Sequence, residues 1–332
     1  MIRRKNFASR FNWIPMNPFV VVAVALLSMC ICGQGQGEDW FRFRGPRLDG
    51  VSIESDWRSE WPQSGPPIAW TVSVGTGFSS VAVSEGRVYT MGNEENVDTV
   101  YCLSSDSGAE IWTHDYSSPT DPNEFDGGPT STPTVAGNRV FTLSRQGMLY
   151  CFDKFSGRVC WSVNAAQLAE VRVPAWGFSG APLVCGDLVI LNVGDAGVAV
   201  NCDTGELAWA SQDRDAGYAT PVPVPDVEPK QVIIGSSRSY VCVEVASGAE
   251  VWRQRWLTTF GCNAADPIID AGRIFLSSGY NRGAALLKPG GDDAPQVVWK
   301  SKEMQNQIST SVLVDGYLYG IHGDVDHEPV LR

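Results

Sequence analysis

Histidine is scarce in this chain, and the catalytic signatures that depend on it are missing. Only three histidines occur in 332 residues, and no HExxH, GxSxG, Walker or dinucleotide-binding pattern stands at a convincing position. The nine cysteines form no CxxC pair and no cluster with histidine, which argues against a zinc site. These absences exclude the commonest histidine-, nucleotide- and zinc-based chemistries as readings of the sequence.

Long apolar runs are also missing, apart from one near the N-terminus. That run, from Phe19 to Cys32, has 14 residues, whereas a transmembrane helix needs roughly 20. Four basic residues precede it within the first ten positions, and the small, polar stretch GQGQG follows at 33–37. The layout predicts a secretory signal peptide at 1–37. The alternatives are an uncleaved anchor and a lipid attached to Cys30 or Cys32.

Basic residues are outnumbered in the rest of the chain. Residues 38–332 carry 37 acidic and 21 basic residues, a net charge of −16. Such a surface repels phosphate backbones and anionic lipids. We therefore expect no nucleic-acid partner. From the predicted signal peptide we expect no transmembrane segment after its cleavage and a location in the periplasm or outside the cell.

An internal repeat is the feature that the sequence does have. Tryptophan recurs at steps of 42, 49, 48, 43 and 47 residues, and four of the six tryptophans stand four residues after a glycine. A period of about 40–50 residues built of short apolar strands and turns is typical of a propeller or a solenoid. The six are Trp70, Trp112, Trp161, Trp209, Trp252 and Trp299.

Each repeat contains four strand-like segments separated by turn residues. In the second repeat these are 130–137, 138–144, 147–153 and 158–163, with alternating apolar and polar residues. The pattern predicts an all-β fold, a β-propeller of four-stranded blades at 66–332, preceded by an N-terminal extension at 38–65. The tryptophan of each outer strand is predicted to dock against the next blade.

Six blades are visible, and the two ends of the propeller region complement each other. Trp70 lies in PIAWTVSVG, which looks like a fourth strand alone, whereas ISTSVLVDG, YLYGIHGD and EPVLR near the C-terminus look like the first three. The two ends would combine into a closing sixth blade. The other reading is a truncated ring of seven or eight blades.

Three cysteines occupy equivalent strand positions. Cys102, Cys151 and Cys242 each precede the repeat glycine by six residues, and the third repeat has Ala199 there. A position that accepts Cys or Ala suits a small buried apolar group. We expect these cysteines to be packing residues and not part of a disulfide framework.

The repeat pattern resembles that of pyrroloquinoline-quinone (PQQ)-type propellers. The matching elements are a small residue followed by Pro-x-Val-x-Gly, a strand, and then C/A-x-D/N-x-x-S/T-G-x-x-x-W. The resemblance covers about residues 66–332, and the opening DWFRFRGPRLDGVS (39–52) looks like the start of exported bacterial propellers of this group. The family includes quinoprotein alcohol dehydrogenases and the propeller lipoprotein of the outer-membrane assembly machine, so the resemblance implies the fold and leaves the function open.

The resemblance to the dehydrogenases implies PQQ and calcium as cofactors. Those enzymes hold the quinone against adjacent cysteines, many carry a CxxCH haem site, and they normally have eight blades. This chain has no adjacent cysteines, no CxxCH and about six blades. We therefore expect no cofactor, with PQQ and calcium as the alternative.

Two sets of residues are candidates for binding. Aligning the first strands on their proline gives a ring of small residues broken by Asp266, which either caps backbone amides or, with Asn263, contacts a ligand such as PQQ with calcium. The long connections 117–130 and 165–180 would build a raised lip, on which Trp176 and Phe178 are candidate recognition residues. The ring comprises Ser80, Thr132, Ala181, Thr220, Asp266 and Ser311.

The cluster HGDVDHE (322–328) contains metal-ligating residue types but stands at a predicted hairpin turn. A polar turn is the simpler interpretation, so no metal site and no catalytic residue are predicted. The sequence favours an exported, non-catalytic, monomeric propeller that binds a protein or peptide in the cell envelope. A PQQ- and calcium-dependent dehydrogenase relative is the alternative.

Overall fold

The computed structural model describes residues 37–55, 57–123, 125–211, 215–290, 293–323 and 329–332. The predicted signal peptide, apart from Gly37, lies outside the described residues, as do positions 324–328 of the cluster at 322–328. The compact unit that carries the strands runs from Asp39 to Arg332. Within the described part of the chain, no helix is long and apolar enough to cross a membrane.

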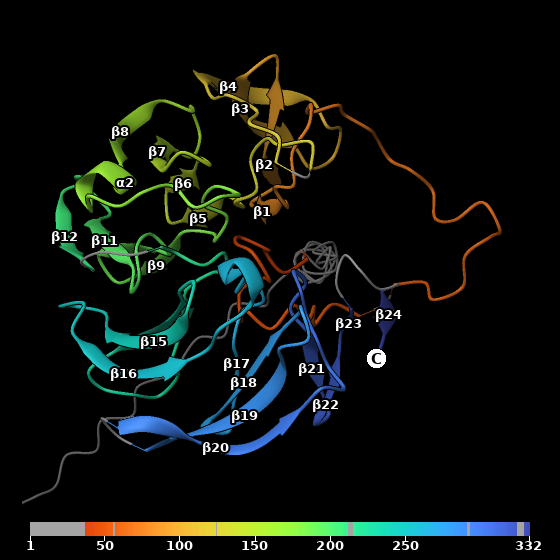
Figure 1. Ribbon diagram of the computed structural model, residues 1–332. Coiled ribbons are helices and arrows are strands. Elements are labelled where there is room, and N and C mark those ends of the chain that lie inside the picture. The colour runs from red at the N-terminus through yellow and green to blue at the C-terminus, as the bar shows by residue number, and fades with distance from the viewer. Residues whose placement is uncertain (1–36, 56, 124, 212–214, 291–292, 324–328) are drawn as a thin grey trace, which may run out of the picture. The chain divides into compact units, whose positions relative to one another are not determined.

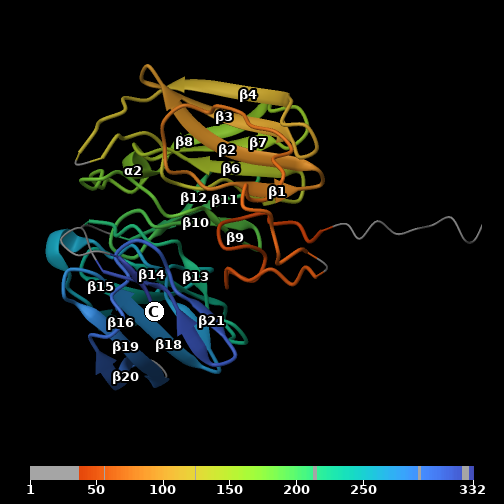
Figure 2. The same ribbon diagram turned by 90° about the vertical axis from the view of Figure 1, so that its right-hand side faces the viewer.

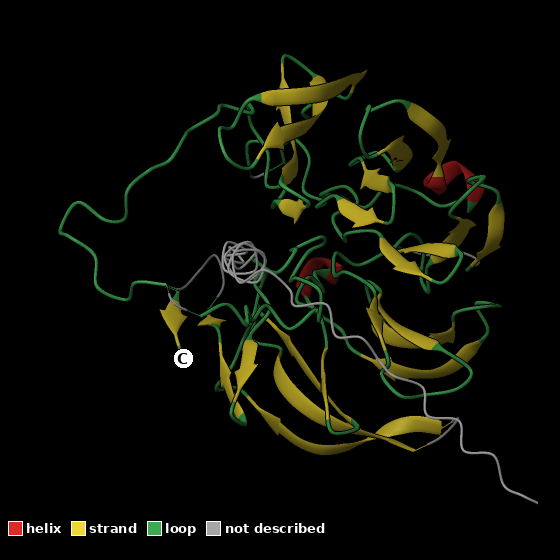
Figure 3. Cartoon of the chain, turned by 180° about the vertical axis from the view of Figure 1, so that it is seen from behind, coloured by secondary structure: helices red, strands yellow, loops and turns green. Residues whose placement is uncertain are grey.

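Almost all regular structure is strand (Figure 3), interrupted by the short helix α2 (Ala165–Leu168) and the 3-10 turn η1 (Thr259–Gly261). Five four-stranded antiparallel sheets follow one another along the chain (Figure 1), and we call them blades 1 to 5. The first strands of blades 1, 2 and 3 contact one another, so these blades run from an inner to an outer strand, as Figure 2 shows for blade 1. This architecture confirms the predicted all-β propeller with four-stranded blades.

The strands of the five blades are short, and each blade follows chain order. Blade 1 contains β1 (Ala82–Ser84), β2 (Arg87–Glu94), β3 (Val97–Ser104) and β4 (Glu110–Ser117). Blade 2 contains β5 (Thr134–Ala136), β6 (Arg139–Leu143), β7 (Met148–Asp153) and β8 (Val159–Asn164). Blade 3 contains β9 (Leu183–Cys185), β10 (Leu188–Leu191), β11 (Val198–Asn201) and β12 (Leu207–Ala210). Blade 4 contains β13 (Val222–Pro223), β14 (Gln231–Gly235), β15 (Ser239–Glu244) and β16 (Glu250–Arg255), and blade 5 contains β17 (Ile268–Asp270), β18 (Arg273–Ser278), β19 (Gly283–Gly290) and β20 (Asp293–Ser301).

The apolar core is a series of layers between neighbouring blades. One cluster joins Tyr89 and Trp112 of blade 1 to Val140 and Phe152 of blade 2, and equivalent clusters join blade 2 to 3, blade 3 to 4 and blade 4 to 5. The second strand of each blade is buried along almost its whole length because both faces of a blade meet a neighbour. The apolar residues of each repeat therefore bury area between blades, and no blade has a core of its own.

The repeated tryptophan fastens one blade to the next. The indole Nε1–H of Trp112 in β4 donates to the carbonyl oxygen of Lys154 in blade 2 at 3.0 Å, and its ring lies on Gly157. A Cβ on Gly157 would come within 2.5 Å of that ring, and the residue has a φ of +69°. Both the close approach of the ring and the left-handed backbone therefore require glycine. Each glycine that precedes a tryptophan thus accommodates the tryptophan of the preceding repeat. The same indole bond joins Trp70 to Ser105 at 2.8 Å, Trp161 to Cys202 at 3.0 Å and Trp209 to Val245 at 2.8 Å.

The last two repeat tryptophans lie in different surroundings. Trp252 is 5% exposed and packs in the cluster between blades 4 and 5. Trp299 is 40% exposed, and its ring contacts Phe275 of its own blade with centroids 6.1 Å apart.

The sixth repeat forms two small sheets in place of one blade. β21 (Val312–Val314) pairs with β22 (Tyr317–Tyr319), and β23 (Ile321–His322) pairs with β24 (Val330–Leu331). Among the described residues, no strand ladder connects the segment around Trp70 to these strands; its only bridge joins Thr76 to Asn93 of blade 1. Of the two interpretations of the chain ends, the blade made from both ends is therefore not formed by the described residues. β24 has only two residues, both exposed, so it offers a very short edge for another strand.

The N-terminal segment 39–50 lies on the inner strands of several blades. Trp40 bridges to Val83 of β1, and the backbone amide of Val135 in β5 donates to the carbonyl of Phe41 at 2.8 Å. The Arg44 guanidinium donates to the carbonyl of Ser311 at 3.0 Å, beyond blade 5. Leu48 packs against the cluster between blades 3 and 4. This segment therefore connects blades that are far apart in the sequence.

Candidate functional site

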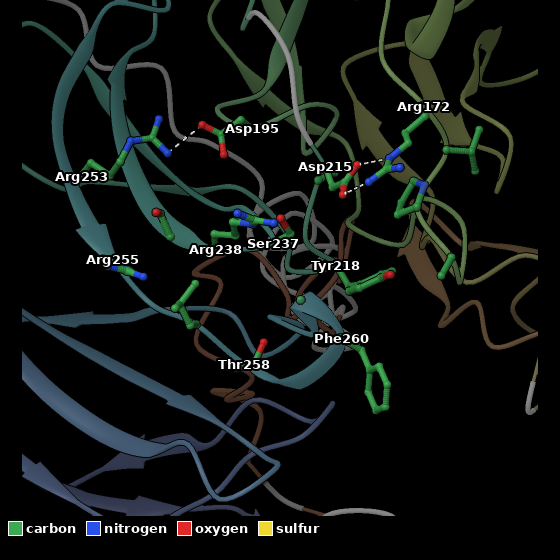
Figure 4. Close-up of a pocket in the computed structure, with 17 residues that line it drawn as sticks. Arg172, Asp195, Asp215, Tyr218, Ser237, Arg238, Arg253, Arg255, Thr258 and Phe260 are labelled. Atoms are coloured by element: carbon green, nitrogen blue, oxygen red, sulfur yellow. Dashed lines mark hydrogen bonds and ion pairs between the residues drawn. The ribbon is translucent and has the colours of Figure 1, made fainter.

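A cavity of about 1000 Å³ opens at the end of blades 3 and 4 that carries their β10–β11 and β14–β15 hairpins (Figure 4). The connections between blades 2 and 3, 3 and 4, and 4 and 5 complete its walls. Its lining comes from 172–175, Asp195, Asp215, Ala216, Tyr218, 237–239, Arg253, Arg255, Leu257, Thr258, Phe260 and Gly261.

Charged residues dominate the polar lining of the cavity. Arg172 binds Asp215 through both carboxylate oxygens, and Arg253 contacts Asp195 at 2.7 Å (Figure 4). Arg253 also reaches Glu250, at 2.7 Å, just outside the cavity. Figure 4 shows Arg238 between these two pairs.

Arg238 and Arg255 are two further cations of the lining, and the charge of Arg238 acts on Asp215 without an ion pair between them. Both side chains belong to exposed residues, and neither makes an ion pair with a described residue. The four arginines face two lining aspartates, so the cavity is locally positive although the chain carries a net charge of −12.

Hydrogen bonding and burial set the ionisation of two lining residues. Hydrogen bonds from Arg172 lower the pKa of Asp215, and the charges of Arg172 and Arg238 lower it further. Burial raises the pKa of Tyr218 to about 12. At neutral pH Asp215 is therefore ionised and Tyr218 neutral, and Arg172 is held by its aspartate.

Aromatic rings form a row along one edge of the cavity. The Trp176 ring lies edge-on to Tyr218 and Phe260, with centroid distances of 5.8 Å and 6.2 Å, and Phe260 lies edge-on to Tyr280 at 5.7 Å. Phe260 is 71% exposed and has φ +61°, a left-handed conformation that is rare and costly for a bulky residue. The fold thus holds an exposed phenylalanine in a strained conformation beside the arginines.

The two residues predicted on the lip, Trp176 and Phe178, differ in their burial. Trp176 is half-buried in the aromatic row, and its indole N–H donates to the carbonyl of Asn123 at 3.0 Å, which ties the connections 117–130 and 165–180 together. Phe178 is fully buried, so its assignment as a surface recognition residue is wrong. Its backbone amide donates to the Arg145 carbonyl, which turns the ring into the core between blades 2 and 3.

Asp266 extends a chain of hydrogen bonds between inner strands. The backbone amide of Ala181 donates to Thr220 Oγ1 at 3.2 Å, the amide of Thr220 to Asp266 Oδ1 at 2.7 Å, and the amide of Asp266 to Thr310 Oγ1 at 2.7 Å. In the same way the amide of Ser80 donates to Thr132 Oγ1. Asp266 therefore takes the structural place that threonine takes in other blades.

Asn263 uses its whole side chain to hold backbone and hydroxyl groups. Its Nδ2 donates to the carbonyls of Ser236 and Trp256, and its Oδ1 accepts from Thr258 and Ser278. Within the described chain no hydrogen bond joins Asn263 to Asp266. The structure thus places the two residues in separate networks.

These residues do not fit a calcium–quinone site. Calcium takes six to eight oxygen ligands. Asp266, however, is buried, and one of its oxygens accepts a hydrogen bond from the Thr220 amide. The Oδ1 and Nδ2 atoms of Asn263 are both engaged in hydrogen bonds. The described residues contain no group of three or more His, Cys, Asp or Glu that could hold a metal ion. We therefore propose no reaction step that involves Asp266 or Asn263.

Sequence reasoning missed the cavity arginines. They come from three separate segments, with Arg172 between blades 2 and 3, Arg238 in the β14–β15 hairpin, and Arg253 and Arg255 both at the end of β16. The alternating pair Arg253 and Arg255 at the end of an outer strand was the one local signal. Their convergence with Arg172 and Arg238 depends on how blades 3 and 4 pack.

Comparison with known proteins agrees with this architecture. The family of the outer membrane protein assembly factor BamB matches residues 96–327. BamB of Yersinia pestis is 26% identical over 259 residues, which cover 74% of this chain and 58% of the relative, so the chain spans less than two thirds of that protein. BamB of Escherichia coli K12 is 24% identical over 313 residues, covering 76% of this chain and 75% of the relative.

Solved structures show the same fold. BamB from Moraxella catarrhalis superimposes with a TM-score of 0.56 at 14% identity, covering 78% of this chain and 74% of that one. A europium-containing methanol dehydrogenase gives a TM-score of 0.57 at 14% identity, covering 72% of this chain and 54% of the enzyme. At such identity these structures establish the fold alone. Because the family match extends over most of the chain, this protein belongs to the BamB family of outer membrane protein assembly factors, among the PQQ-type propellers.

Proposed function

We propose that this chain is exported and acts as a non-catalytic, monomeric interaction propeller in outer-membrane protein assembly, with the cavity between blades 3 and 4 as its partner-binding site. The observation that carries this proposal is the cavity itself, which combines Arg238 and Arg255, two arginines without a described ion pair, with an aromatic row whose Phe260 is exposed. Exposed aromatic and arginine side chains in a concave site are typical of protein-binding hot spots. Membership of the BamB family supports a role in assembly.

The described cavity lining supports binding better than catalysis. It contains no histidine or cysteine, and both of its aspartates are held by arginines. A nucleophile with an adjacent general base is therefore not provided by these side chains. The lining is suited to hold a ligand by charge and by stacking.

Photocrosslinking in the source bacterium tests the proposed site. The full chain would carry a photoreactive phenylalanine at Leu257, which lines the cavity and is 44% exposed, or at the control position Leu207 on the outer strand of blade 3, which is 42% exposed. We expect a crosslink to an outer-membrane assembly component from position 257 and not from 207. Equal crosslinking from both positions, or none from 257, would overturn the proposed site.

A calorimetric titration with PQQ and calcium tests the dehydrogenase alternative on the same purified protein. We expect no binding at micromolar concentrations. Saturable, calcium-dependent binding would favour the alternative function, and an Asp266→Ala variant would show whether that residue takes part.

A further inference from the structure

The proposed binding site differs in charge from the protein that surrounds it. Residues 38–332 carry a net charge of −16, yet the cavity brings four arginines together against two aspartates. A concave surface with charge of one sign concentrates ions of the other sign. The cavity is therefore suited to an anionic ligand, and the rest of the surface repels one.

The cavity also shows which anion its guanidinium groups take. Arg172 holds the Asp215 carboxylate through two nitrogens, and Arg253 holds the Asp195 carboxylate at 2.7 Å. The planar fork of arginine matches a carboxylate in this way. Arg238 and Arg255 present the same fork in the same cavity without a described carboxylate to bind.

Size and apolar lining point to a peptide as the ligand. A volume of about 1000 Å³ lies at the upper limit of small-molecule pockets. Leu257 and Phe260, which are 44% and 71% exposed, lie beside the arginines and would cover an apolar side chain. A small carboxylic acid would leave this apolar surface uncovered.

We propose that the cavity binds an extended acidic peptide segment of a partner protein, with glutamate or aspartate carboxylates on Arg238 and Arg255 and an apolar side chain against Phe260. The strained backbone of Phe260 fits this role, because strain of this kind concentrates at binding sites. The inference rests on the proposed function and specifies the chemistry of the partner.

Fluorescence anisotropy with a short labelled peptide of alternating Glu and Leu tests the inference on the purified chain. We expect saturable binding that weakens as salt is added, and no binding of the matched neutral Gln–Leu peptide. Arg238→Glu and Arg255→Glu should each weaken binding at least about tenfold. Arg158→Glu changes the charge equally at an exposed turn of blade 2, outside the cavity, and should leave the affinity unchanged.

Three results would overturn the inference. These are equal binding of the Glu–Leu and Gln–Leu peptides, equal affinity of the Arg238→Glu, Arg255→Glu and Arg158→Glu variants, and stronger competition by a single-stranded oligonucleotide than by the acidic peptide. Thermal melts of each variant establish that it is folded, since these arginines are exposed and surface substitutions rarely change stability strongly.

The crosslinking experiment and the peptide-binding experiment can fail independently of each other. Crosslinking from position 257 without acidic-peptide binding would overturn the inference and leave the assembly role in place. Charge-dependent peptide binding without a crosslink to an assembly component would support the inference and overturn the assembly role.

Discussion

Backbone amides of one inner strand donate to side chains of the next, and at Asp266 the acceptor is a carboxyl group where other blades use threonine. Burial raises the pKa of Asp266 to about 7, against the lowering effects of Arg44 and of the hydrogen bond from Thr220. Its second oxygen is buried without a hydrogen-bond partner among the described residues. A single residue therefore makes the stability of the inner strands around Asp266 dependent on pH.

Asp266→Asn should remove this sensitivity. Because the folded-state pKa is raised above the unfolded value, the folded protein binds the proton more tightly, and stability falls as the pH rises from about 4 to about 7. We expect the variant to gain on the order of 1–3 kcal/mol relative to the wild type across this window. Urea unfolding at a series of pH values measures the difference, and a difference independent of pH would contradict the raised pKa.

Phe260→Asn should separate binding from stability. Asparagine tolerates the left-handed conformation of position 260 better than phenylalanine, and the replaced ring is 71% exposed. We expect the melting temperature to be maintained or raised and the affinity for the acidic peptide to fall about tenfold, as for an aromatic hot spot. A variant that melts lower and binds normally would show that Phe260 has a packing role only.

At the scale of the strand, the third and fourth strands of every blade share one irregularity. Cys102 pairs with Trp112, Cys151 with Trp161, and Cys242 with Trp252, and a register shift follows each of these cysteines. Cys102, Cys151 and Cys242 are buried and unpaired. The small residue leaves room for the tryptophan across the ladder, and the bulge turns that tryptophan toward the next blade.

Trp209→Ala and Trp299→Ala should differ strongly in their effect on stability. Trp209 is 9% exposed and donates to Val245 of the next blade, whereas Trp299 is 40% exposed and contacts its own blade. We expect Trp209→Ala to cost roughly 3–5 kcal/mol and Trp299→Ala less than half of that. Equal losses in guanidinium unfolding would show that indole docking does not decide the contribution of these residues.

At the scale of the whole molecule, the segment 39–50 contacts blades that do not follow one another in the sequence. It bridges to β1 and β5 and packs against the cluster of blades 3 and 4. Arg44 alone donates to the carbonyls of Leu48, Asp49, Thr310 and Ser311. Solenoid-like arrays in which each repeat contacts only its neighbours lack such long-range links.

Arg44→Met should weaken the whole unit, because it leaves partly buried carbonyl groups without donors. We expect a loss of about 2–4 kcal/mol and faster hydrogen exchange in β21 and β22, which follow Thr310 and Ser311. Arg47→Met is the matched control, since the side chain of Arg47 bonds Asp49 and Val51 on its own segment. Similar exchange rates in both variants would argue against a long-range role for Arg44.

The strands of blade 2 illustrate how far local sequence can predict the fold. The segments expected at 138–144, 147–153 and 158–163 correspond to β6, β7 and β8 within one or two residues. Their alternation and turn residues are local properties. The burial of Phe178 was not predictable from local sequence, because an aromatic residue in a long connection looks the same in sequence whether it faces solvent or the core.

The sequence by itself determined the repeat, the strand order within each blade and the residues that dock one blade on the next, because these depend on spacing along the chain. Only the tertiary structure decided that Arg172, Arg238, Arg253 and Arg255 share one cavity, that Asp266 substitutes for a threonine, and that segment 39–50 reaches several blades. Those features arise from contacts between residues tens to hundreds of positions apart, and no local pattern encodes such distances.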